Sequence, residues 1–212
     1  PVSAHFGFDR GFDVFESFTA TAKTANEKTW DINSLQRRSD QTTDMALDYV
    51  SRTTSPFMMW IHYWDPHDSA RILVRPQRGE LQVYRGAAWT QPAPDLVLDT
   101  LLRAFSDSGR LAGVARRGEG VNAQYELLLD LRRFESDYDG GATPSARIEL
   151  GARLVHNADN RVVASRVFDV ATAANGTDVV QVSRAFERAL GDANMQLIGW
   201  VLAEGNRSAR ER

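Results

Sequence analysis

Hydrophobic and polar positions after residue 70 fall into short blocks that predict strands and a helix in turn. Apolar residues dominate 71–74 and 80–84, and a proline and a glycine separate the two runs, which predicts two strands joined by a turn. Along 94–105, leucines and a phenylalanine recur at intervals of three and four residues. This spacing predicts an amphipathic helix, which Gly109 is placed to end.

The middle of the chain alternates apolar with polar residues, the pattern of half-buried strands. Alternation runs along 125–132 and 146–154, and a further apolar run spans 161–170. Turn-forming residues separate these runs at 139–141 and at 157–160. We therefore expect three consecutive antiparallel strands.

Helical spacing returns near the C-terminus, where apolar residues recur from Val182 to Val201. Asp178, with Gln181 three residues later, resembles a capping box at the start of a helix. The predicted fold class is α/β. It is a layered sandwich with a mixed, partly antiparallel sheet and a long C-terminal helix, preceded by a small helix-strand fragment.

That preceding fragment lies within residues 1–68. Helical spacing in 40–50 is followed by a β-prone apolar run at 57–63, which ends in polar groups at Asp65 and His67. A lone helix-strand unit of this kind cannot bury its own apolar face.

Composition divides the chain at the same place. Both lysines, Lys23 and Lys28, precede residue 69, and every basic residue after it is arginine. We interpret 1–68 and 69–212 as two pieces of different ancestry, the alternative being one domain of uneven composition.

Charge and cysteine content limit the function classes. A net charge of −3 gives no overall attraction to nucleic acid, and no run approaches the roughly 20 apolar residues of a membrane-spanning helix. The absence of cysteine excludes disulfides, thiolate zinc sites and a cysteine nucleophile. The arginine pairs at 116–117 and 132–133 are expected at solvated edges, and His156 is expected at a turn or on the surface.

The second piece, 69–212, resembles the ABC-type transport auxiliary lipoprotein family. The resemblance rests on the runs 71–74, 81–89 and 94–102, on the segment 125–136, and on a closing helix that contains Trp200. It covers about two thirds of the chain in the family's order. The lipid-bearing cysteine and the usual first strand of the family are missing from this stretch.

The resemblance implies a non-catalytic role in binding and assembly within a lipid-transport system. Its members are tethered by a lipid in the bacterial periplasm, where they work beside mammalian-cell-entry (MCE) type substrate-binding proteins and an ABC permease and ATPase. It also implies a three-layer sandwich, and it allows phospholipid contact and a homo-oligomer. We expect no cofactor, no metal and no nucleic acid, and a lipid anchor that lies outside this chain.

Three aromatic residues are the candidate contacts for lipid or partner in this piece, namely Tyr84, Trp89 and Trp200. Core packing is the alternative role for each. A further alternative for the whole piece is a generic α/β domain with an unrelated role.

The first piece resembles the middle of a bacterial sulfatase of the alkaline-phosphatase superfamily. The resemblance rests on 7–15, on 37–44 and on the segment 56–67, which ends in Asp-Pro-His. It implies that His67, beside Asp65, contacts the substrate sulfate. The nucleophile motif and the other metal-binding segments of a sulfatase are absent, so the alternative function is a metal-dependent sulfatase of which only a fragment is present.

A metal cluster of His62, Asp65 and His67 is a further alternative for the first piece. Residues 62 and 67 face opposite sides of a strand unless the Pro66 turn reorients the second. We therefore expect no bound metal there.

Overall fold

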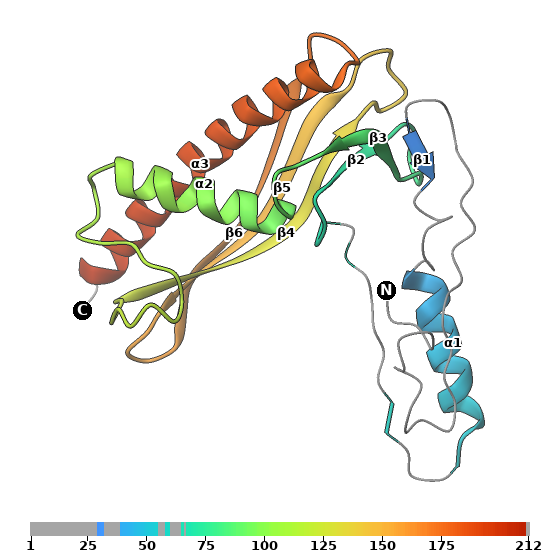
Figure 1. Cartoon of the computed structure of the whole chain (residues 1–212). Helices are drawn as coiled ribbons and strands as arrows, with labels where there is room; N and C mark the ends of the chain where they lie inside the picture. The colour runs from blue at the N-terminus through green and yellow to red at the C-terminus, as the bar shows by residue number, and fades with distance from the viewer. Residues whose placement is uncertain (1–28, 32–38, 55–57, 60–64, 66, 211–212) are drawn as a thin grey trace.

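The structure is a computed structural model that describes residues 29–31, 39–54, 58–59, 65 and 67–210 (Figure 1). Six strands in these residues form one sheet in the spatial order β1-β3-β2-β4-β5-β6. The elements in chain order are β1 (Thr29–Asp31), α1 (Ser39–Arg52), β2 (Arg71–Arg75), β3 (Gln82–Ala88), α2 (Ala93–Asp107), β4 (Tyr125–Asp137), β5 (Ser145–His156), β6 (Arg161–Ala173) and α3 (Val179–Arg210).

The three long strands form the antiparallel meander that the alternating pattern predicts. β4 pairs with β5, and β5 pairs with β6, over nearly their whole lengths. The turns between them use left-handed backbone at Asp139 (φ 45°), Gly140 (φ 75°) and Asn160 (φ 53°). Aspartate, glycine and asparagine tolerate this conformation better than other residues, so the sequence specifies both turns.

The mixed character of the sheet comes from β2. β2 and β3 form the predicted hairpin, and β2 then lies parallel to β4, with Leu73 opposite Glu135 and Arg75 opposite Asp137. Parallel neighbours need a long connection, which β3 and α2 provide. The predicted α/β class with a mixed sheet and a long C-terminal helix is confirmed.

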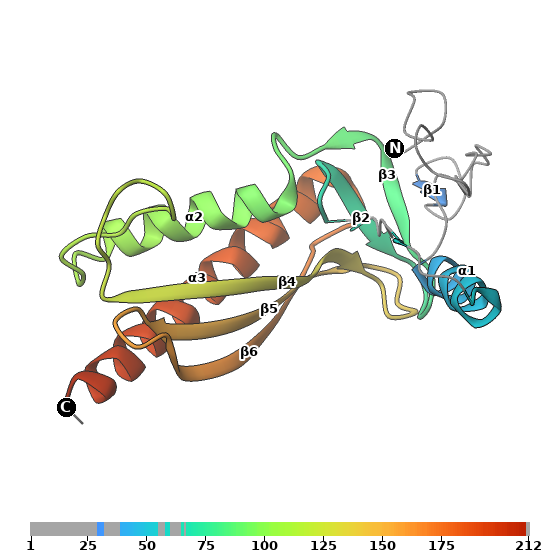
Figure 2. The same ribbon diagram turned by 90° about the horizontal axis from the view of Figure 1, so that it is seen from below.

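Both α2 and α3 pack on the same face of the sheet (Figures 1 and 2). Along β5, every second side chain from Ala146 to Leu154 is buried against these helices. α2 contributes Val97, Leu101 and Phe105 to the same hydrophobic cluster. Burial of this apolar surface is the main force that holds helices and sheet together.

The opposite face, here called the helix-free face, is polar along β4 to β6, whereas Leu73 of β2 and Val83 of β3 form a small apolar cluster on it. The strand registers place Arg133, Glu135, Arg147, Glu149 and Asp169 on it. Neither α2 nor α3 packs there, and the described residues form two layers where the family resemblance implies three. A face whose charges are paired with one another needs no apolar cover, which is the physical reason for the difference.

The start of α3 follows the predicted cap. The Asp178 side chain accepts hydrogen bonds from the backbone N–H groups of Val180 and Gln181, each at 3.1 Å. An N-cap carboxylate satisfies donors that would otherwise have no partner and also interacts favourably with the helix dipole.

The first piece of the chain contributes one helix and one short strand to the described residues. α1 coincides with the helix predicted at 40–50. The strand predicted at 57–63 lies outside the described residues except for Met58 and Met59, which form no strand. β1, which the pattern did not predict, pairs antiparallel with β3, with Trp30 opposite Val83. The sheet therefore continues from the second piece into the first.

Candidate functional site

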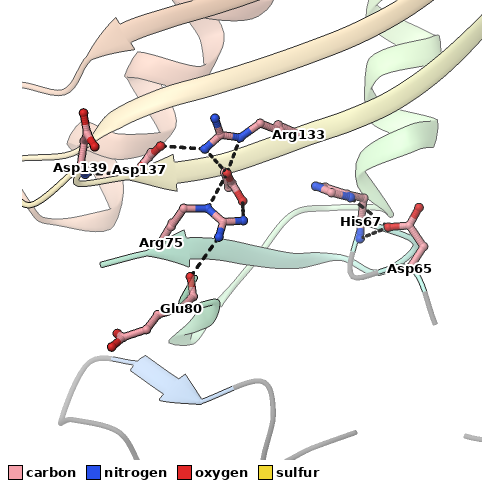
Figure 3. Close-up of polar contacts among 8 residues, drawn as sticks. Asp65, His67, Arg75, Glu80, Arg133, Asp137 and Asp139 are labelled. Atoms are coloured by element: carbon pink, nitrogen blue, oxygen red, sulfur yellow. Dashed lines mark hydrogen bonds and ion pairs between the residues drawn. The ribbon is translucent and has the colours of Figure 1, made fainter. Parts of the chain in front are cut away.

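A cluster of paired charges occupies the helix-free face where β2 meets β4 (Figure 3). Arg75 donates two hydrogen bonds to the Glu135 carboxylate, from Nε to Oε1 and from Nη2 to Oε2, both at 2.9 Å. Arg133 donates to Glu135 Oε1 at 2.6 Å and to Asp137 Oδ2 at 2.7 Å. We call these four residues the ion network.

Glu135 is the buried centre of the ion network, with a side chain that is 2% exposed. Burial alone would raise the pKa of Glu135, but the hydrogen bonds and charges of Arg75 and Arg133 outweigh burial and hold the pKa below its ordinary value. The same bidentate contact raises the pKa of Arg75. Glu135 is therefore an ionised structural partner and is not poised as a general acid.

Strand geometry explains why the network forms. Arg133, Glu135 and Asp137 alternate along β4 and so point to one face, and the parallel register brings Arg75 opposite Asp137. The expectation of a solvated edge at 132–133 was wrong for Arg133, whose side chain is only 23% exposed. Arg132, at an irregularity of the β4–β5 register, is the more exposed and pairs with Asp130.

Two of the predicted contact residues pack within or against the hydrophobic core. Trp89 packs edge-on against Phe134 and Phe186, with ring centroids 5.5 and 5.0 Å away. Trp200 packs against Phe168 at 5.7 Å and is 8% exposed. Their packing roles are clear from these contacts, whereas a role in lipid or partner contact stays a prediction.

Tyr84 lies at the border between core and surface on β3. Burial raises the pKa of Tyr84 to about 12, and the neighbouring Ser136 hydroxyl lowers it in part. The phenol is therefore protonated across the physiological range. Tyr84 also lines an open hollow in the surface over β3.

The structure brings Asp65 and His67 together, away from the ion network (Figure 3). Asp65 Oδ1 accepts a hydrogen bond from the His67 backbone N–H at 2.8 Å and lies 2.9 Å from His67 Nδ1. His67 is 9% exposed, whereas Asp65 is exposed. Their hydrogen bonds form a local turn just before the second piece begins. His62, the third residue of the alternative metal cluster, lies outside the described residues, which contain no group of three potential metal ligands.

His156 lies beside the predicted turn, as expected, but it is buried. It ends β5, is 4% exposed, and its Nδ1 lies 2.8 Å from Asp159 Oδ1, while its ring stacks at a tilt on Tyr125. The hydrogen bond from His156 lowers the pKa of Asp159. This histidine is a structural residue that joins the β5–β6 turn to the core.

Comparison with known proteins assigns the family of this chain. A family model described as "ABC-type transport auxiliary lipoprotein component" matches residues 66–197. The chain belongs to this family. The family match begins three residues before the start of the second piece and ends within α3.

Two relatives place the chain among known sequences and structures. A crystal structure of a protein from Xanthomonas campestris is 51% identical, with a TM-score of 0.66, and the alignment covers 68% of this chain and 81% of that one. An uncharacterized protein from Bradyrhizobium diazoefficiens is 28% identical over 145 residues. That alignment covers 65% of this chain and 38% of the relative, so the chain spans well under half of that protein's length.

These matches bear differently on the two sequence resemblances. The resemblance of 69–212 to the auxiliary lipoproteins is confirmed. The sulfatase resemblance of 1–68 gains no support from them and stays a prediction. Among the helices of the described residues, none has both the length and the apolar character that crossing a membrane requires.

Proposed function

We propose that this chain is a non-catalytic auxiliary component of an ABC transport system that moves lipids, and that it acts by binding and assembly. The observation that supports this proposal is the family match over residues 66–197, which include the whole of β2 to β6 and α2 and most of α3. The proposed partners are an MCE-type substrate-binding protein and the ABC permease and ATPase. The proposed site of action is the periplasm, with a lipid anchor outside the stretch described.

The polar groups of the site are consistent with a role in binding. In the ion network, each carboxylate is matched by a guanidinium and no charge is left to act on a substrate. The Asp65 and His67 side chains contact each other across a turn, through Asp65 Oδ1 and His67 Nδ1. Acid-base chemistry needs a group whose pKa suits proton transfer and that faces a substrate, and the ion network offers none because its arginines hold the buried Glu135 in the ionised form.

We also propose that residues 69–212 carry this role and that 1–68 are a separate piece attached to it. The two hydrophobic clusters of the described residues draw all their members from position 73 onward. Of the three predicted aromatic contacts, Tyr84 has the best access to a ligand because it lines the hollow on β3.

Capture from a bacterial envelope tests the proposal. The affinity-tagged chain, expressed in its native background and solubilised in mild detergent, is expected to bring down an MCE-type protein together with an ABC permease and ATPase, identified by mass spectrometry. An unrelated periplasmic domain with the same tag is the control. Recovery of neither partner above that control would contradict the proposal.

A further inference from the structure

An open hollow of about 320 Å³ lies over β3 on the surface of the sheet. Its lining consists of Arg71, at the start of β2, and the continuous segment 83–88 of β3. Arg71 and Val83 share their side of the sheet with Leu73, which places the hollow on the same side as the ion network. Its walls combine arginine side chains with apolar groups.

A large bulge in β3 creates this hollow. Leu73 of β2 stands opposite Val83, but Arg71, two residues earlier, stands opposite Ala88. Ile72 alone therefore faces the four residues 84–87, which leave the β2–β3 ladder. Gly86 has a φ of 71°, a conformation that glycine adopts without strain, so the sequence allows the bulge at this position.

The arginines of the hollow differ from those of the ion network. Arg75 and Arg133 of the network each contact a carboxylate. Arg71 and Arg85 are exposed, and within the part of the chain that the structure describes their guanidinium groups contact no carboxylate. Two unneutralised guanidinium groups beside a concave surface create a local positive potential that favours an anion.

We propose that this hollow binds the phosphate group of a phosphate-bearing ligand, with Arg71 and Arg85 as the donors. Guanidinium groups form paired, charge-assisted hydrogen bonds with phosphate oxygens. Val83, Ala87 and Ala88 supply apolar surface beside the arginines, which suits a ligand that carries both a phosphate and a hydrocarbon portion. This inference rests on the proposed function in one respect, since lipid transport makes a phospholipid headgroup the expected source of that phosphate.

Binding of two probes to the full chain tests the inference at physiological salt. Isothermal titration with dihexanoyl phosphatidylglycerol measures headgroup binding, and titration with inorganic phosphate measures binding of the bare anion. The double variant R71Q/R85Q is expected to weaken headgroup binding by at least about tenfold, because two charge-assisted hydrogen bonds are lost. Inorganic phosphate is expected to compete for the same site.

A matched variant separates the site from general surface charge. R78Q/R110Q removes the same two charges from arginines that are also exposed and that contact no carboxylate within the described residues, but neither lines the hollow. Its affinity is expected to stay within about threefold of the native chain, because long-range charge effects are screened by salt. Thermal melts of both variants verify that the fold is retained.

The outcomes separate the sources of the phosphate. Headgroup binding that R71Q/R85Q alone weakens supports a lipid site, whereas phosphate binding without headgroup binding supports a site for a free phosphate. The inference is overturned if the native chain binds neither probe, or if both double variants lose affinity equally. If the titrations show no binding but an MCE-type partner is captured, the proposed function stands without this binding site. If the titrations show binding but no partner is captured, the binding site stands without the proposed function.

Discussion

At the scale of single residues, Glu135 is the side chain whose replacement has the largest expected effect on stability. Glu135→Gln keeps the size of the side chain but leaves Arg75 and Arg133 without their shared carboxylate. Loss of one partner from a buried ion pair costs several kcal/mol. Since both arginines retain partial access to water, we expect a fall of about 3 kcal/mol in the free energy of unfolding, measured by urea denaturation.

The exposed pair of Asp130 and Arg132 provides the matched control. Asp130→Asn also removes one carboxylate from an arginine on β4, but the Asp130 side chain is 65% exposed. Exposed ion pairs contribute little to stability, so we expect the free energy of unfolding to change by less than about 1 kcal/mol. Equal effects of the two substitutions would contradict the special role of Glu135.

The same residue predicts a pH dependence. The folded-state pKa of Glu135 lies below its ordinary value of 4.5, so its ionised form contributes stability above that value. This contribution is lost as the pH falls through the folded-state pKa. We therefore expect the difference in unfolding free energy between the native chain and Glu135→Gln to be constant well above pH 4.5 and to shrink as the pH falls below that value. Other acidic groups, such as Asp159, are present in both proteins and largely cancel in this comparison.

The sequence predicted some of these residue roles and missed others. The alternating pattern ended at residue 132, so it did not show that an irregularity between Leu131 and Arg133 turns Arg133 and Glu135 to the polar face. It could not show that Arg75, 60 positions earlier, would reach Glu135, because a parallel register between distant strands leaves no local pattern. The burial of His156 was missed for a similar reason, since its partner Tyr125 belongs to another strand.

At the scale of elements, the cap of α3 offers a direct test. Asp178→Ala removes the carboxylate that accepts hydrogen bonds from Val180 and Gln181. We expect a loss of about 1 kcal/mol in unfolding free energy, the usual effect of losing an N-cap. Asp192→Ala, an exposed aspartate in the interior of the same helix, is the control and should change stability by less than half as much. If the two variants unfold at the same urea concentration, the prediction that the Asp178 cap stabilises the protein is contradicted.

Local patterns predicted most of the helices and strands. α2, α3 and the three strands of the meander all have strong periodicity, and aspartate, glycine and asparagine occupy the turns between the strands. β1 was missed because three residues are too short to show alternation. The β3 bulge was also missed, because Gly86 alone does not show how many neighbouring residues leave the ladder.

At the scale of the whole molecule, the second piece of the chain should fold without most of the first. Both hydrophobic clusters consist of residues from Leu73 onward, and β1 contributes only three residues to the sheet. We expect a chain of residues 66–212 to unfold in one cooperative transition, within about 1 kcal/mol of the full chain. Circular dichroism during urea denaturation measures this, and a broad or absent transition would contradict it.

The number of layers could not be predicted at this scale. The sequence pattern is compatible with a sheet covered on one face or on both, since arginine and glutamate at alternate positions fit either a solvated face or a covered polar one. The structure resolves this because Glu135, Arg147 and Asp169 find partners on neighbouring strands. Only the assembled sheet brings those charges together.

The parallel pairing of β2 with β4 also has a consequence for how the protein is made. As the chain leaves the ribosome, β2 emerges about 60 residues before the segment that holds Glu135. Until then the hairpin of β2 and β3 lacks its neighbour, and the apolar side chains of Ile72, Leu73 and Val74 have no sheet to cover them. The meander of β4 to β6 can form by local hairpins, so β2 joins the sheet late in folding. During that interval the nascent chain exposes an aggregation-prone strand. We expect a chaperone that binds 71–75 to raise the yield of folded protein.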